Sequence, residues 1–177
     1  MIHQGNLIIE TPADAANCAA VTEVTGTLVV SVPCKLPALP ALTTVGGGLA
    51  IHADATLPAL TTLGGDLRIR ADAALSALTT VGRGLYIHAA TTLPALTTVA
   101  GYLRIIADAA LPALTSAQGV KGRLLCVSTY GLWLGDNDLL YAGCRGGLTV
   151  AQALAHWDRD DRLAIKFTAA IKALQTN

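Results

Sequence analysis

The chain has 177 residues, of which 53% are hydrophobic but only 4% are aromatic, and its twelve basic residues balance twelve acidic ones. A globular core of this size normally contains more large rings, so the composition favours a layered core of aliphatic side chains. The zero net charge argues against a general nucleic-acid binder and against a membrane-surface binder.

The first ten residues, MIHQGNLIIE, lack the basic and apolar regions of a signal peptide. No apolar run in the sequence reaches the roughly 18 residues that are needed to cross a bilayer. We therefore expect a cytoplasmic protein that does not contact a membrane.

A repeat of eighteen residues fills most of the chain. The leucine of the pattern GxLxI marks each copy, with the middle copies eighteen residues apart and the others displaced by three-residue insertions: Leu7, Leu28, Leu49, Leu67, Leu85, Leu103 and Leu124. Each copy has the period-two alternation of a short strand, and a fixed period of this kind indicates a solenoid. The sequence therefore predicts a mainly β protein in which residues 1–127 form a parallel β-solenoid of about seven rungs of 18–21 residues.

The unchanging positions of the repeat predict its core and one ladder. In the copy that begins at residue 57, the inward side chains are expected to be Leu57, Leu60, Leu63, Leu67 and Ile69. Paired threonines recur in every full copy, as at Thr61 and Thr62, and one hydroxyl of each pair is expected to stack in a ladder that bonds turn backbone. The register also places Cys18, Cys34 and Cys126 in core slots, whereas Cys144 lies outside the repeat.

Two solenoid families have coils of eighteen residues. A left-handed hexapeptide helix, which remains the alternative, needs a small residue at the slot where this repeat has Leu67 and its equivalents. The spacing L-x-x-L-x-x-V-x-x-x-L-x-I instead resembles leucine-rich-repeat-like solenoids, in particular the receptor L-domains, over residues 5–127. This resemblance implies a right-handed helix.

The composition changes after the repeats, and residues 128–177 are predicted to form a capping module. Two strands joined at Gly135–Asp138 have the pattern of a hairpin. Thr149 and Gln152 then form a capping box before a helix, and a second helix follows over 161–174. The motif LWLGDNDLLYAGCR…TVAQALAHW behind such repeats resembles proteins encoded by bacteriophages and prophages. That resemblance implies a host-directed role, such as inhibition of a host or defence protein.

No motif in the sequence requires catalysis, so we expect no enzyme, no catalytic residue, no metal and no cofactor. The glycine run at 45–50 recurs as a turn and lacks the GK[ST] of a phosphate-binding loop. Asp54, Asp72 and Asp108 recur at one turn and are interpreted as caps of turn backbone, with a calcium ladder as the alternative.

The varied positions of the repeat carry the candidate site. An idle outward face needs no particular side chain, yet this one holds residue types that are enriched at protein interfaces. The predicted partner-binding residues are His52, Arg68, Arg70, Tyr86, His88, Tyr102 and Arg104, with Ile106 beside them and Thr91 in a turn away from them. The hypothesis is a non-enzymatic module that binds a protein. A nucleic-acid-binding solenoid, a structural or oligomerising phage protein and a merely solvated face are the alternatives, and the oligomeric state stays open.

Overall fold

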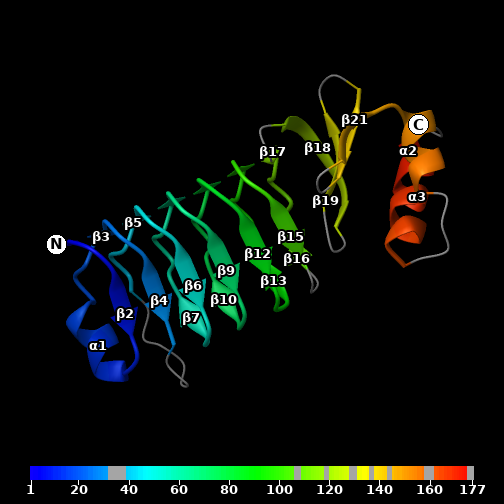
Figure 1. Ribbon diagram of the computed structural model, residues 1–177. Coiled ribbons are helices and arrows are strands. Elements are labelled where there is room, and N and C mark those ends of the chain that lie inside the picture. The colour runs from blue at the N-terminus through cyan, green and yellow to red at the C-terminus, as the bar shows by residue number, and fades with distance from the viewer. Residues whose placement is uncertain are drawn as a thin grey trace.

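The protein forms a parallel β-solenoid that is followed by an antiparallel sheet and two helices (Figure 1). The computed structural model describes residues 1–31, 39–105, 109–117, 120–127, 131–135, 138–142, 145–157 and 162–174. None of the helices in these ranges is long and apolar enough to cross a membrane.

Each turn of the solenoid contributes one strand to each of two long faces. The six-stranded parallel sheet consists of β2 (Leu7–Ile9), β4 (Leu28–Val30), β6 (Leu49–Ile51), β9 (Leu67–Ile69), β12 (Leu85–Ile87) and β15 (Leu103–Ile105). The second face is built by shorter strands, β1 (Ile2–His3), β3 (Glu23–Val24), β5 (Thr44–Val45), β8 (Thr62–Leu63), β11 (Thr80–Val81), β14 (Thr98–Val99) and β17 (Ser116–Ala117). The predicted parallel β-solenoid is therefore confirmed, while the right-handed coiling of the solenoid stays a prediction.

The third side of the solenoid carries two separate pairs of strands. These are β7 (Ala55–Thr56) with β10 (Ala73–Ala74), and β13 (Thr91–Thr92) with β16 (Ala109–Ala110). These pairs are not joined into one continuous sheet, so this side is the least regular of the three.

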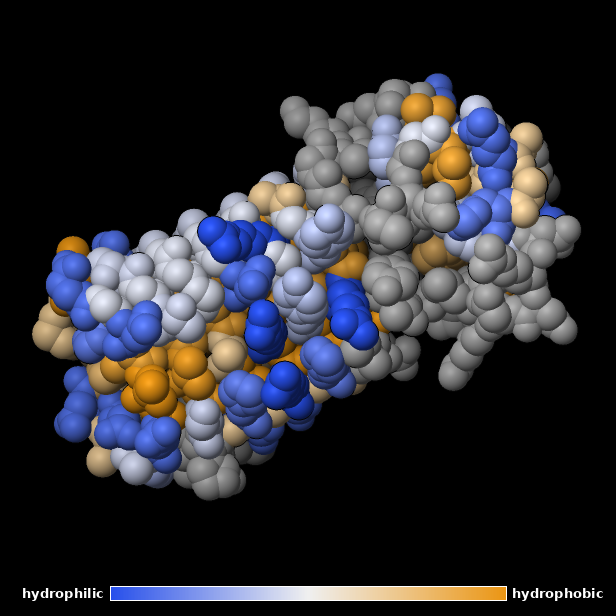
Figure 2. All heavy atoms as spheres, viewed as in Figure 1, coloured by the Kyte–Doolittle hydropathy of each residue, from blue (hydrophilic) through white to orange (hydrophobic). Residues whose placement is uncertain are grey.

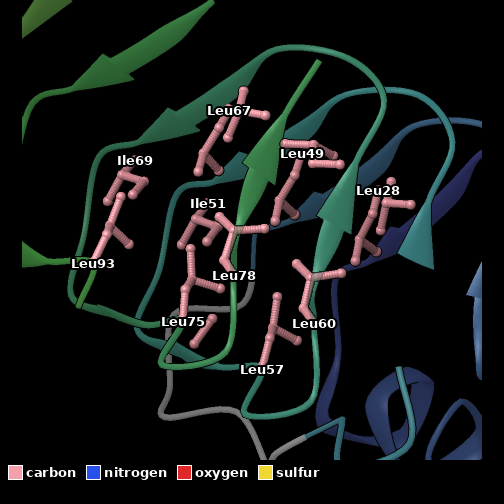
Figure 3. Packing of buried hydrophobic residues seen from close by; sticks show 14 of the residues in the cluster. Leu28, Leu49, Ile51, Leu57, Leu60, Leu67, Ile69, Leu75, Leu78 and Leu93 are labelled. Atoms are coloured by element: carbon pink, nitrogen blue, oxygen red, sulfur yellow. The ribbon is translucent and has the colours of Figure 1, made fainter. Parts of the chain in front are cut away.

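The core lies inside the solenoid as stacked columns of aliphatic side chains. Leu57, Leu60, Leu63, Leu67 and Ile69 are all buried, as predicted. Figure 3 shows how the equivalent leucines of neighbouring rungs point into the same interior. The register explains this stacking, because Leu67 pairs with Leu49 on one side and with Leu85 on the other. The repeat is copied because each rung completes the core of its neighbours.

The predicted threonine ladder is present. The hydroxyl of the first threonine of each pair donates to the backbone carbonyl of the equivalent threonine one rung earlier, at 3.0–3.3 Å: Thr43 to Thr22, Thr61 to Thr43, Thr79 to Thr61, Thr97 to Thr79, and Thr115 to Thr97. The same carbonyls also accept the backbone N–H of those threonines. The hydroxyls therefore reinforce the stacking of the rungs from outside the core.

Replacing Thr79 with Val is expected to lower the free energy of unfolding by about 1 kcal/mol, the usual net value of one hydrogen bond. Valine keeps the shape of the side chain but removes the hydroxyl that donates to Thr61. The matched control is Thr80→Val in β11, because the Thr80 hydroxyl makes no such bond; urea unfolding of both variants measures the difference. Equal losses in the two variants would contradict a stabilising ladder.

The predicted seventh rung is wrong, and six parallel strands stack in the sheet that starts at β2. Leu124 lies in β18 (Val120–Val127), which pairs antiparallel with β17. In the full rungs three residues lie between the last inward position of one face and the leucine of the next, as between Val99 and Leu103, but six lie between Ala117 and Leu124. The last insertion therefore falls in a different bend from the earlier ones. Because the connection from β17 to β18 has two residues, it suits a hairpin and is too short for a parallel crossover.

The first rung contains a short helix that the repeat pattern does not predict. Helix α1 (Pro12–Asn17) follows β2 where β7 follows β6, and its N-cap Thr11 forms a capping box with Asp14. The Asp14 carboxylate accepts hydrogen bonds from the Thr11 hydroxyl and from the backbone N–H groups of Glu10 and Thr11. These bonds hold the pKa of Asp14 below its usual value. The signal was in the sequence TPAD, where threonine precedes proline at the first helical position.

Cys18 ends this helix and packs against the solenoid core, as the register predicts. Its carbonyl accepts the N–H of Val21, just as that of Leu57 accepts the N–H of Leu60. Burial, with a smaller contribution from Asp14, raises the pKa of its thiol. Cys34, Cys144 and the side chain of Cys126 lie outside the described residues.

The C-terminal part contains the predicted hairpin and both predicted helices. Strands β19 (Gly131–Gly135) and β20 (Leu140–Ala142) form the hairpin, which β18 and β21 (Arg145–Leu148) extend into an antiparallel sheet. Helix α2 (Val150–His156) begins with the predicted capping box of Thr149 and Gln152, and α3 (Arg162–Leu174) follows. These elements share a second small core: Leu132, Leu140, Ala153, Trp157, Phe167 and Ile171.

Candidate binding face

The structure brings all seven predicted partner-binding residues to the outer side of the six-stranded sheet. Arg68, Tyr86 and Arg104 are the middle residues of β9, β12 and β15, and the strand register aligns them in one column. Because neighbouring strands are about 4.8 Å apart, their Cα atoms follow one another at that spacing. Ile106, which the pattern places beside them, lies outside the described residues.

Two flanking columns complete the surface. His52, Arg70 and His88 follow the ends of three successive strands, and each donates its backbone N–H to the last strand residue of the preceding rung at 2.8–2.9 Å. Tyr102 precedes β15 and shares its column with Asp66 and Gly84. We call the seven residues, His52, Arg68, Arg70, Tyr86, His88, Tyr102 and Arg104, the arginine–tyrosine face.

Contacts within the arginine–tyrosine face orient its central side chains. The guanidinium of Arg68 lies 3.7 Å from the Asp66 carboxylate and 5.4 Å from the centre of the Tyr86 ring. Asp66 also accepts the backbone N–H of Gly84 at 2.9 Å, so it connects two rungs. A Cβ atom at residue 84 would lie 2.7 Å from the Tyr86 ring, so glycine there lets the ring lie against the backbone.

Most of these side chains remain available to a partner. The side chain of Arg68 is 55% exposed and Tyr102 is 63% exposed. His52, Arg70, His88 and Arg104 are also exposed, whereas Tyr86 is half-buried. Guanidinium groups form paired hydrogen bonds with carboxylates or phosphates, and tyrosine adds contact area with little loss of side-chain freedom. The surface is therefore suited to binding.

Arg83 belongs beside this surface, although the repeat pattern did not single it out. It is exposed, occupies the slot of Gly65 in the next rung, and lines a hollow of about 480 Å³ together with Asp66, Arg68 and the glycine turns. The missing side chains of Gly46–Gly48 leave this hollow open. The repeat register alone could have identified Arg83, because it replaces a glycine that the preceding rung has at Gly65.

A larger hollow of about 990 Å³ lies on the third side of the solenoid, along β7, β10, β13 and β16. Its lining is mostly alanine and threonine, with Asp54 and Asp72 among the residues around it. Neither of these carboxylates makes the predicted hydrogen bond to turn backbone, because the backbone there bonds to the next rung, as Ala55 does to Asp72. Asp108 lies outside the described residues.

Thr91 lies away from the arginine–tyrosine face, but it is buried in β13 (Thr91–Thr92) and does not lie in a turn as predicted. Thr91 is 9% exposed, and the equivalent position in the other rungs is alanine: Ala55, Ala73 and Ala109. Its hydroxyl lies 3.5 Å from the Ala73 carbonyl. No strand pairing joins β10 to β13, so the ladder is interrupted where the larger residue enters. Thr91 is therefore unsuitable as a surface control.

Metal binding has no obvious location in the described ranges, where no three His, Cys, Asp or Glu side chains converge. Comparisons of the chain with protein-family models, with curated proteins and with solved structures find no match.

Proposed function

We propose that the protein is a non-enzymatic binding module whose arginine–tyrosine face engages another protein. The observation that carries the proposal is the in-register column of Arg68, Tyr86 and Arg104 on the outer side of the six-stranded sheet, where β9 and β12 are paired on both sides and β15 on one. A rigid sheet presents these side chains with little ordering cost at binding, which favours affinity. Arginine and tyrosine are also the residue types that most often dominate interface energies.

The finer identity of the partner rests on the sequence resemblance. The repeats resemble leucine-rich-repeat-like solenoids, which supports a right-handed twist and a ligand-binding role. The C-terminal motif resembles phage-encoded proteins, which supports a partner of bacterial origin and an inhibitory effect on it. Such a protein acts by occupying a surface of its target, so its activity is measured as complex formation.

The test is capture of a partner from a bacterial lysate by the wild type and by Arg68→Glu with Arg104→Glu. We expect the double variant to bind the captured protein at least tenfold more weakly, as measured by calorimetry. The free energy of unfolding should change by only about 0.5 kcal/mol for each exposed substitution. Wild-type affinity in the double variant would contradict the proposal.

A charge-matched control separates the site from the total charge. Lys172 on α3 and both Ser76 and Thr92 on the third side are exposed and lie away from the face. The variant Lys172→Glu, Ser76→Glu and Thr92→Glu changes the net charge by the same amount as the double reversal. We expect it to bind the partner like the wild type.

Nucleic acid is the second ligand to test, because regularly spaced arginines also bind phosphates. The Asp66 carboxylate inside the surface opposes a polyanion, and the column continues into apolar residues that a phosphate backbone would not use. Oligonucleotide binding whose affinity falls steeply with salt would favour nucleic acid over protein.

A further inference from the structure

The column of Arg68, Tyr86 and Arg104 continues to the N-terminal end of the solenoid. The strand register joins the middle residues of all six strands into one line: Ile8, Val29, Ala50, Arg68, Tyr86 and Arg104. At about 4.8 Å for each step, five steps extend over roughly 24 Å. The six-stranded sheet therefore presents one straight line of side chains, and its two halves have different chemistry.

The N-terminal half of the line is apolar and reaches solvent. Ile8 is 55% exposed, and Val29 and Ala50 are half-buried. Figure 2 shows a hydrophobic area over β2 and β4 that adjoins a hydrophilic area over β9, β12 and β15. Ile8 lies at the centre of the edge strand β2 with more than half of its surface in water, so the apolar half is suited to contact with another molecule.

The C-terminal half of the line is cationic and aromatic. Arg68 and Arg104 lie on it, and Arg70 and Arg83 flank it. Asp66 is the one carboxylate at the described outward positions of β9, β12 and β15 and the residues that flank these strands. Charge complementarity therefore selects an acidic ligand for this half, while the apolar half selects one that also carries hydrophobic side chains. A polypeptide combines the two, and a nucleic acid does not.

The spacing of the two arginines favours a helical polypeptide. Arg68 and Arg104 are two rungs apart, or about 9.6 Å. Helix residues seven positions apart lie on the same face about 10.5 Å apart, and residues three or four positions apart lie near Tyr86 between them. In an extended strand, same-face residues lie at about 6.8 or 13.6 Å, which fits neither interval. A helix of about 16 residues covers the whole line at 1.5 Å for each residue.

We propose that the segment recognised by this face is an amphipathic helix of the partner that lies along the solenoid axis, with two acidic residues seven positions apart over Arg68 and Arg104 and apolar residues over Ile8, Val29 and Ala50. The inference rests on the proposed function and names the kind of segment that it would bind. The flanking Arg70 and Arg83 provide further contacts for acidic residues beside the helix.

The probe is a display library of random 18-residue peptides selected against the immobilised full-length protein. We expect the enriched peptides to contain two acidic residues seven positions apart, next to an apolar stretch, and to show helical circular dichroism when bound. Affinity should fall at least tenfold in Arg68→Glu with Arg104→Glu, and again in Ile8→Asp with Ala50→Asp. The control Lys172→Glu on α3 should bind within twofold of the wild type.

Milder substitutions guard against loss of folding in these variants. Arg68→Gln with Arg104→Gln and Ile8→Ser with Ala50→Ser should each reduce affinity at least threefold while the melting temperature stays that of the wild type. Failure to enrich any peptide, enrichment of peptides without acidic residues, or binding that survives both pairs would overturn the proposal. A concentration-dependent mass in light scattering that the arginine pair abolishes would instead assign the surface to a second copy.

The two proposals fail in different ways. If the captured partner loses affinity in Arg68→Glu with Arg104→Glu but keeps it in Ile8→Asp with Ala50→Asp, the arginine–tyrosine face stands and the bipartite helix is wrong. If both pairs leave the captured partner bound as in the wild type, the face itself is not the binding site.

Discussion

Replacing Leu67 with Asp is expected to unfold the solenoid. Leu67 is completely buried in the middle of the repeat, with Leu49 and Leu85 in register on either side. The described side chains packed around it are aliphatic and provide no hydrogen-bond donor for a carboxylate. Burying an unpaired charge costs several kcal/mol at least, and a domain of ordinary stability has about 5–15 kcal/mol in total.

The matched control for this substitution is Arg68→Asp, one position further along the same strand. The side chain of Arg68 points outward and is 55% exposed, so the same carboxylate there stays in water. Thermal unfolding followed by far-ultraviolet circular dichroism compares the two variants. The wild-type protein should give a β-dominated spectrum with a minor helical part. A soluble Leu67→Asp protein with an unchanged melting temperature would show that the register of the repeat is wrong.

Repetition made the solenoid predictable. Six strands, their inward residues and the threonine ladder follow from the rule that identical rungs place identical residues on top of one another, as Leu49, Leu67, Leu85 and Leu103 do. The hairpin and the helices after it were also predictable, because turn residues and the capping box of Thr149 and Gln152 act locally. Local chemistry and translational symmetry leave few alternatives.

The predictions that failed depend on where the chain departs from this symmetry. Leu124 lies in an alternating segment like the others, but the direction of β18 is decided by the short connection before it and not by its own pattern. Thr91 looks like its exposed neighbours in sequence, yet it takes a slot where the other rungs have alanine. Asp66, and not Asp54 or Asp72, bonds to backbone, because it alone of the three stands beside the next rung's glycine N–H.

The candidate site follows from the same reasoning with one limit. Outward positions are readily identified from the repeat, so the placement of the seven residues on one side of the sheet was predictable. Arg83 and the apolar residues Val29 and Ile8 occupy positions that the repeat register also defines, and the strand pairing confirms the register of Ile8 and Val29. The exposure of Ile8 and the hollow beside Arg83 depend on side-chain packing, which the repeat pattern does not give.

Deleting residues 129–177 is expected to convert the protein into aggregates or oligomers. The last turn of the solenoid keeps its leucines covered, with Leu103, Leu111 and Leu114 all buried. Tyr141 of β20 packs against this core, and β19 lies against β15 and pairs with β18. Removal of these elements exposes both the apolar cross-section and an open strand edge, which terminal caps of repeat proteins normally prevent.

Size-exclusion chromatography with light scattering measures the outcome for the truncated chain. The full-length variant Tyr141→Glu is the companion experiment, because it introduces a charge where β20 meets the solenoid core while the second core around Phe167 and Ile171 is left in place. We expect this variant to show a lower melting temperature and a milder tendency to associate than the truncated chain. A truncated chain that stays monomeric and melts like the wild type would mean that residues 129–177 do not act as a cap. Since these residues would then not be needed to stabilise the solenoid, the search for a binding surface would move to them.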